Sequence, residues 1–159
     1  MTSSLCLTEL DGMASDSHAL RRILLAIYFI GLAGLAAELF LLEHYEDVWQ
    51  WVPLGLLAAG LFAGLAFALR PGRAVILAFR ALMVLFVAAG AVGAYLHLRG
   101  NLEFERESDP ALQGAALLWE ALQGATPALA PGALAQLGLV GLALAYRHPA
   151  LNPSNSGRR

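Results

Sequence analysis

The chain of 159 residues carries very little charge and almost no cysteine. Charged side chains make up 14% of it, whereas a soluble globular domain typically has about 25%. So few charges cannot cover the surface of a soluble fold of this size. The single cysteine, Cys6, excludes a disulfide-stapled secreted domain. The net charge of −2 leaves no basic surface of the kind that binds nucleic acid.

The chain also lacks the motifs that carry most enzyme chemistry. It has no phosphate-binding loop, no dinucleotide-binding fingerprint, no H-E-x-x-H zinc motif and no nucleophile elbow. Serine is confined to the terminal segments and Ser108, so we expect no serine nucleophile within the apolar part of the chain. These absences predict a protein that is not an enzyme and that holds no cofactor and no metal.

Long apolar runs dominate the remaining sequence. Hydrophobic residues make up 58% of the chain and its mean hydropathy is +0.63. A helix needs roughly 20 residues to cross about 30 Å of hydrocarbon. The runs are apolar on all sides, which excludes the alternating strands of a transmembrane barrel. We predict four membrane-spanning helices, over residues 22–43, 48–69, 74–98 and 129–147.

These spans predict an all-α fold, an integral membrane four-helix bundle over residues 20–148. Short links make the first three helices antiparallel neighbours. In the longer third connection, apolar side chains recur at spacings of three and four, which predicts a short amphipathic helix over residues 110–123 on the outer membrane surface. The polar ends, residues 1–19 and 149–159, are predicted to be disordered cytoplasmic tails.

Arginines are concentrated on one side of the predicted bundle. Seven lie on the side of the two termini and two on the opposite side. This asymmetry predicts that both termini are cytoplasmic. All ten basic residues are Arg in a chain rich in Ala, Leu and Gly, which is typical of a GC-rich bacterial genome. Together with the predicted spans, this composition predicts a protein of the bacterial inner membrane. The first apolar run imitates a secretory signal but continues past Glu38 to a full span, so we expect it to be retained.

Small residues recur along one face of each predicted span. In lipid they let helix backbones approach closely, so they mark packing faces. We interpret these faces as packing within the chain; the alternative is that one of them docks on another membrane protein. The predicted packing glycines are Gly31, Gly34, Gly60, Gly64, Gly93, Gly138 and Gly141.

Glu38 is the acidic residue placed well inside a predicted span, about one turn from its outer end. Ionisable residues in spans are costly and usually face the bundle interior or a polar cavity. His97 lies at a similar depth in the third span, so Glu38 and His97 form a candidate intramembrane polar site. Two interpretations stay open: Glu38 binds a proton or a cation, or it is a structural hydrogen-bonding group.

A second candidate is an outer acidic cluster in the loop after the first span. With Glu38 and His97, this cluster offers nitrogen and oxygen ligands for a divalent metal, but its spacing matches no metal motif. We expect a solvated acidic cap, because charged runs in loops are usually hydrated. The cluster consists of Glu43, His44, Glu46 and Asp47.

Two functions fit this sequence. The first is a non-catalytic accessory or scaffold subunit of a larger membrane complex, whose partners are the lipid bilayer and other membrane protein subunits or further copies of this chain. The second is a small oligomeric proton or cation transporter or channel that uses Glu38. The first is favoured, because a four-helix protomer has little room for a pathway of its own.

Overall fold

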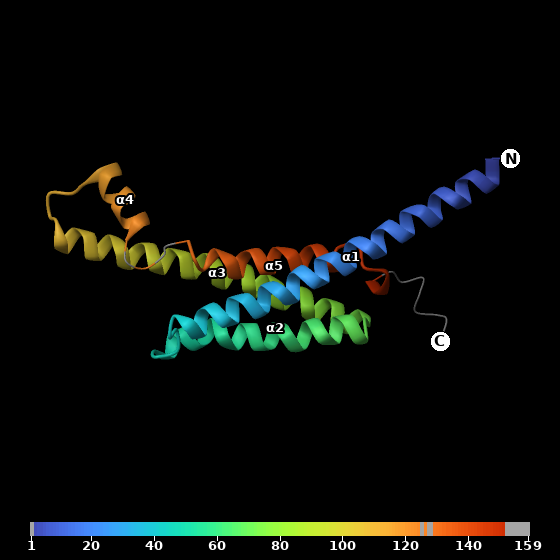
Figure 1. Cartoon of the computed structure of the whole chain (residues 1–159), viewed down its shortest axis with the longest axis horizontal. Coiled ribbons are helices and arrows are strands. Elements are labelled where there is room, and N and C mark those ends of the chain that lie inside the picture. The colour runs from blue at the N-terminus through green and yellow to red at the C-terminus, as the bar shows by residue number, and fades with distance from the viewer. Residues whose placement is uncertain (1, 125, 127–128, 152–159) are drawn as a thin grey trace.

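A computed structural model describes residues 2–124, 126 and 129–151, with side chains from Ser17 onward. The prediction of an all-α fold is confirmed: the described residues form helices and contain no strand (Figure 1). The helices are α1 (Thr2–Leu41), α2 (Trp51–Leu69), α3 (Arg73–Ser108), α4 (Gly114–Gln123) and α5 (Gly132–Ala145), with short 3-10 turns η1 (Val48–Gln50) and η2 (Pro149–Leu151).

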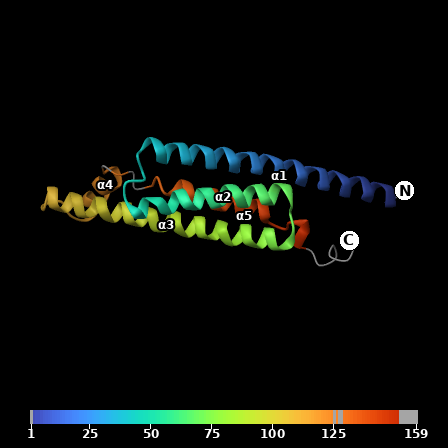
Figure 2. The same cartoon turned by 90° about the horizontal axis from the view of Figure 1, so that it is seen from below.

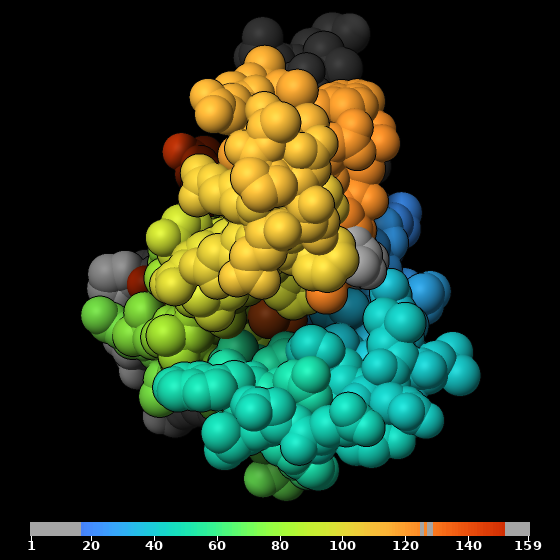
Figure 3. All heavy atoms as spheres, turned by 90° about the vertical axis from the view of Figure 1, so that its left-hand side faces the viewer, coloured from blue at the N-terminus to red at the C-terminus, as the bar shows by residue number. Residues whose placement is uncertain are grey.

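Four of the helices form an elongated bundle. In both ribbon views, α1, α2, α3 and α5 run lengthwise beside one another, and α4 lies at one end against the extension of α3 (Figures 1 and 2). The N-terminal end of α1 and the C-terminal end of α5 lie at the opposite end from α4. Figure 3 looks at the α4 end, where the α3–α4 arm occupies the upper part of the view and the α1–α2 connection the lower part.

Three helices are long and apolar enough to cross a membrane: Ser17–Leu41, Val48–Leu69 and Arg73–Ser108. Helix α5 is also apolar, but it has 14 residues and is shorter than the predicted span over 129–147. It begins directly after Pro131 and ends where Tyr146 turns to an extended backbone. At 1.5 Å per residue its length is about 21 Å. The apolar helices therefore suggest a membrane-embedded protein.

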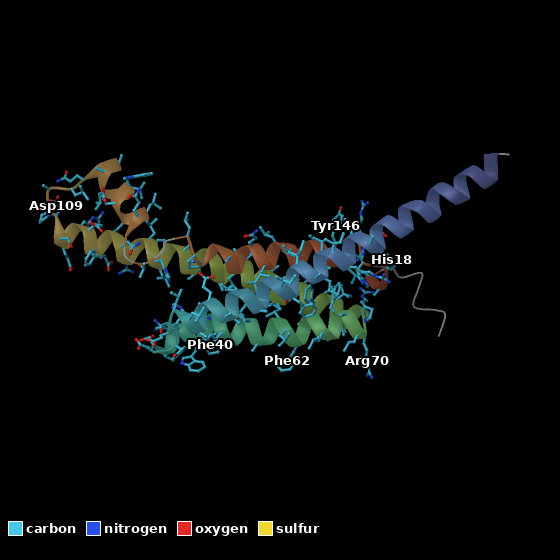
Figure 4. The ribbon with its side chains drawn as sticks, in the orientation of Figure 1. His18, Phe40, Phe62, Arg70, Asp109 and Tyr146 are labelled. Carbon is cyan, nitrogen blue, oxygen red and sulfur yellow. The ribbon has the colours of Figure 1, made fainter. Side chains whose placement is uncertain are left out.

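Large apolar side chains cover the outside of the bundle, as lipid contact requires. Phe40 of α1 and Phe62 of α2 are 58% and 71% exposed, and both point away from the bundle in Figure 4. Such side chains would form an aggregation-prone surface in water. The same figure places Arg70 at the end of α2 that is remote from α4, and Asp109 at the tip of the α3–α4 arm.

The two ends of the chain differ from the predicted disordered tails. The backbone of α1 is helical from Thr2, so residues 2–19 belong to the same helix as the first predicted span. This segment contains no proline and only one glycine, Gly12, and its Ala, Leu and Met residues favour a helix. At the C-terminal end, residues 149–151 form η2, and residues 152–159 lie outside the described part of the chain.

The third connection also differs from the prediction. Helix α3 continues to Ser108, well beyond the predicted end at residue 98, because the charged stretch contains no proline and the exposed Arg99–Glu103 pair, at 2.8 Å, has helical spacing. Helix α4 begins at Gly114 and not at residue 110, since Asp109 ends α3 with an extended backbone. Gly114 takes a φ of +62°, which glycine adopts without strain.

Helix α3 supplies the centre of the core. Its fully buried side chains Ile76, Phe79, Met83 and Phe86 recur at spacings of three and four and form one apolar stripe. Tyr28 of α1 is also completely buried, with its ring edge-on to Phe79 at 5.6 Å. Its hydroxyl donates a hydrogen bond of 3.0 Å to the carbonyl oxygen of Gly60, so this buried polar group is satisfied.

Candidate functional site

Two glycines of α2, Gly60 and Gly64, lie where α2 meets α1 and α3. A Cβ atom at Gly60 would lie 2.7 Å from Cζ of Phe86, and one at Gly64 would lie 2.8 Å from Cε1 of Tyr28. Both glycines are buried. Their lack of a side chain therefore lets α2 approach the Tyr28 ring.

The closest approach of two backbones is between α3 and α5. A Cβ at Gly138 would lie 2.6 Å from the Met83 carbonyl oxygen, and one at Gly141 would lie 2.5 Å from Cγ of Met83. At Gly93, a Cβ would lie 2.8 Å from Cβ of Pro131. Gly90 belongs to the same contact, with Ala135 N at 2.6 Å from its Cβ position. The sequence analysis did not single out Gly90, although it lies three residues, about one helical turn, before Gly93.

The two predicted packing glycines of α1, Gly31 and Gly34, differ from each other. A Cβ at Gly31 would lie 2.8 Å from Cδ2 of Leu137, so this residue faces α5. At Gly34 no atom lies within 4 Å of the Cβ position, and the residue is exposed. The prediction that Gly34 packs against another helix of this chain is therefore wrong. Its open side faces a groove.

This groove, which we call the α1–α5 groove, has a volume of about 300 Å³. Its lining is mostly apolar or small, and its polar side chains are Glu38 of α1 and Gln136 of α5. It is lined by Ile27, Gly31, Gly34, Leu35, Glu38, Ala133, Gln136, Leu137 and Val140. Gln136 was not singled out from the sequence, although it is the one polar residue of α5 and that isolation was the available signal.

Glu38 lies on the face of α1 that carries Gly31 and Gly34, as the spacing predicted, but its side chain is exposed. Its carboxylate makes no hydrogen bond or ion pair with any residue of the described chain. The ring contact of His97 is with His44, whose centroid lies 6.4 Å away. The predicted polar pair is therefore replaced by two separate features, the α1–α5 groove and a histidine pair.

The histidine pair joins the α1–α2 connection to α3. Both side chains are half-buried, and their rings are tilted by 45° to each other. Burial lowers the pKa of His44, and the positive charge that His97 can carry lowers it further. Within the described residues, no three His, Cys, Asp or Glu side chains come together to hold a metal ion. The alternative of a divalent metal site thus has no support from this part of the chain.

In the outer acidic cluster, Asp47 has a structural role. Its carboxylate accepts a hydrogen bond of 2.8 Å from Trp49 N at the start of η1. Gln50 Oε1 in turn accepts from the backbone N–H groups of Glu46 and Asp47, at 2.8 and 3.1 Å. This capping box satisfies backbone donors that precede α2. The remaining acidic side chains, Glu43 and Glu46, are exposed.

Glu43 ends α1 in a left-handed conformation. Its φ is +52°, its N–H donates to the Phe40 carbonyl oxygen at 3.1 Å, and His44 N donates to the Leu39 carbonyl oxygen at 2.9 Å. This is the Schellman arrangement, which favours glycine at the left-handed position.

We predict that Glu43→Gly raises the free energy of unfolding by roughly 0.5–1 kcal/mol, because glycine adopts this φ without strain. The measurement is the thermal midpoint of the purified chain in detergent. Glu46→Gly is the matched control, since Glu46 lies in the same exposed loop without a positive φ. A midpoint that falls equally in both variants would contradict the prediction.

At the opposite end, Arg21 ties α1 to the end of α5. Its guanidinium donates to the carbonyl oxygens of Leu144, Tyr146 and Arg147 at 3.1, 3.2 and 3.2 Å. These are carbonyls that the end of a helix leaves without partners. Nearby, the ring of His148 packs edge-on against Phe67 at 5.2 Å. Burial and the charge of Arg21 lower the pKa of His148. In the sequence analysis, Arg21 counts only as one of the seven arginines that predict the orientation in the membrane.

The α3–α4 arm depends on Asn101, which is 4% exposed in the extension of α3. Its Nδ2 donates to the carbonyl oxygens of Ala121 and Thr126 at 2.8 and 2.7 Å. Its Oδ1 accepts from the N–H and the hydroxyl of Thr126. Helix α4 buries Leu117 and Ala121 and leaves Trp119 60% exposed. One side chain thus holds α4 and the following turn against α3.

Comparison of the chain with protein-family models, curated proteins and solved structures finds no match. The class of the protein follows from its structure: it is an all-helical protein with three long apolar helices and a shorter one, consistent with a membrane protein.

Proposed function

We propose that this chain is a non-catalytic accessory or scaffold subunit of a larger membrane complex, and that it binds a transmembrane helix of another subunit in the α1–α5 groove. The observation that carries this proposal is the position of Glu38 and Gln136. Both line the open groove on the outside of the bundle and not its interior. Polar groups in such a position need a partner when the surroundings are lipid.

The shape of the groove suits a helix. Gly31, Gly34 and Ala133 lie along it, and small residues let a neighbouring backbone come close. The groove lies between two helices of the same chain, so an added helix would contact both α1 and α5. A subunit that presents such a surface stabilises its neighbour by packing and hydrogen bonding, without any reaction of its own.

The transporter alternative receives less support from the same geometry. The interior of the bundle is filled by Tyr28, Phe79, Phe86 and other buried side chains. Glu38 lies at the edge of that interior, in the groove. A pathway past Glu38 would therefore need a second chain to form its other wall.

For the membrane arrangement, we propose that α1, α2, α3 and α5 are the four spans of a protein in the bacterial inner membrane. The N-terminal end of α1 and the C-terminal end of α5 lie at one end of the bundle, as an even number of spans requires (Figure 1). The arginine asymmetry supports a cytoplasmic location for that end. The α3–α4 arm would then lie outside the membrane on the opposite side.

The test is to block the groove. Gly34→Leu adds a side chain where no atom of the chain lies within 4 Å, so the fold should survive while the groove is filled. We expect about tenfold less of this variant in the larger complex, measured by native gel electrophoresis of membranes solubilised in mild detergent. Gly55→Leu is the matched control, because Gly55 is exposed in α2 and equally open.

Two results would contradict the proposal. One is that Gly34→Leu enters the complex as well as Gly55→Leu does. The other is a proton or cation flux in proteoliposomes that Glu38→Gln abolishes while assembly persists, which would favour transport. A scaffold predicts instead that Glu38→Gln keeps assembly, since it retains shape and hydrogen bonding, and that Glu38→Leu weakens it.

A further inference from the structure

We infer that the helix bound in the α1–α5 groove belongs to a different protein and carries an arginine or lysine at the depth of Glu38. This inference rests on the proposed function and adds the chemistry of the partner. It starts from the charge of the groove: Glu38 is its one ionisable lining residue, beside the neutral amide of Gln136 and apolar or small side chains.

Among the side chains that the structure describes, none offers Glu38 a compensating charge. No arginine lines the groove. Arg21, on the same helix, is bound to carbonyl oxygens at the end of α5, and Arg99 pairs with Glu103 at 2.8 Å. Since a carboxylate facing lipid is unfavourable, a cationic group from outside the chain is the complementary partner.

The depth of that group can be deduced from the helix ends. Glu38 lies just before the end of α1 at Leu41, and Gln136 lies just after the start of α5 at Gly132. At 1.5 Å per residue both are about 5 Å from the α4-facing end of their helix. A guanidinium at this level could donate to the Glu38 carboxylate and to Gln136 Oε1 together, because its donors form a planar fork.

A second copy of this chain fits less well. Two copies inserted in the same direction have equivalent residues at the same depth. Glu38 and Gln136 of one copy would therefore lie level with Glu38 and Gln136 of the other. Arg80, the arginine within the apolar part of α3, lies towards the opposite end, two turns from Arg73. Pairing two copies through this groove would therefore bring carboxylates together, which is repulsive when both are ionised.

The experiment uses the full chain in phosphatidylcholine liposomes with synthetic transmembrane helices of about 22 Leu and Ala residues. One peptide carries a single Arg about one turn from the end that aligns with Glu38; the matched peptides carry Leu at that position or the Arg at the centre of the helix, a depth that does not depend on the direction of insertion. Association is measured by energy transfer between labelled chain and peptide. We expect the matched-depth Arg peptide to bind about tenfold more tightly than either control.

Variants of the chain separate this inference from the proposed function. With Glu38→Gln, the affinities of the three peptides should lie within about threefold of one another. Gly34→Leu should weaken the binding of all three peptides, whereas Gly55→Leu should change the binding of none. Equal binding of the Arg and Leu peptides, still blocked by Gly34→Leu, would overturn the basic partner but leave helix docking intact. Binding that ignores Gly34→Leu would overturn docking itself. Energy transfer between two labelled copies that the Arg peptide does not displace would show a second copy in the groove and overturn the inference.

Discussion

Gly138→Val is expected to lower the free energy of unfolding by about 3 kcal/mol, since the new side chain overpacks the α3–α5 contact. A Cβ at this position would lie 2.6 Å from the carbonyl oxygen of Met83, which is a backbone atom and cannot rotate away. Cγ2 of Val87 and Cβ of Phe86 would lie at 2.8 and 2.9 Å, so no direction is free. The two helices would have to move apart, and the buried stripe of α3 would lose contacts with α5.

The measurement is the unfolding midpoint of the purified chain in detergent, followed by circular dichroism. Gly55→Val is the control, because Gly55 also lies in an apolar helix but has no atom within 4 Å of its Cβ position. It carries the same change in helix propensity without the steric conflict. If both variants unfold at the same midpoint, α3 and α5 do not pack as closely as the structure shows.

The apolar runs of the sequence predicted the helices well, and the reason is that lipid imposes a simple rule. A backbone in hydrocarbon must satisfy its own hydrogen bonds, so a long apolar run becomes a helix. The apolar segment Val48–Leu69, which consists of η1 and α2, has the predicted bounds. Where the chain leaves the apolar region this rule no longer applies, and the charged stretch after residue 98 was predicted as a connection although it continues α3 to Ser108.

The glycines show which part of the packing a sequence can predict. Rows of small residues at spacings of three and four identify residues that could face another helix, and the structure places Gly60, Gly64, Gly138 and Gly141 at close approaches. The rows do not say which helix is the neighbour. Gly34 lies on the same face of α1 as Gly31, and both line the α1–α5 groove. Only Gly31 contacts α5, however, because the groove is open at Gly34.

The polar contacts between distant segments were the least predictable, because their partners lie far apart in sequence. Arg21 reaches the end of α5, Tyr28 reaches the carbonyl of Gly60, and Asn101 reaches Thr126. A sequence indicates that each side chain needs a partner, but the partner depends on the tertiary arrangement. This also explains Glu38: its position on the glycine face was evident, whereas its exposure in an open groove depends on where α5 lies.

Asn101→Leu is expected to release α4 from the extension of α3 while leaving the bundle folded. Leucine is similar in size but cannot replace the Nδ2 bonds to Ala121 and Thr126 or accept from Thr126. The carbonyl oxygen of Ala121 would lose its partner where the residue has no exposed surface, and Thr126 would lose its contacts with α3. Leaving such groups without partners costs about 3 kcal/mol, so amide hydrogen exchange in α4 should become about 100-fold faster.

Glu103→Gln is the control, because it removes an exposed ion pair from the same extension of α3 and should change the exchange by less than about threefold. Unchanged protection of α4 in Asn101→Leu would mean that the buried Leu117 and Ala121, and not the asparagine, hold the arm in place.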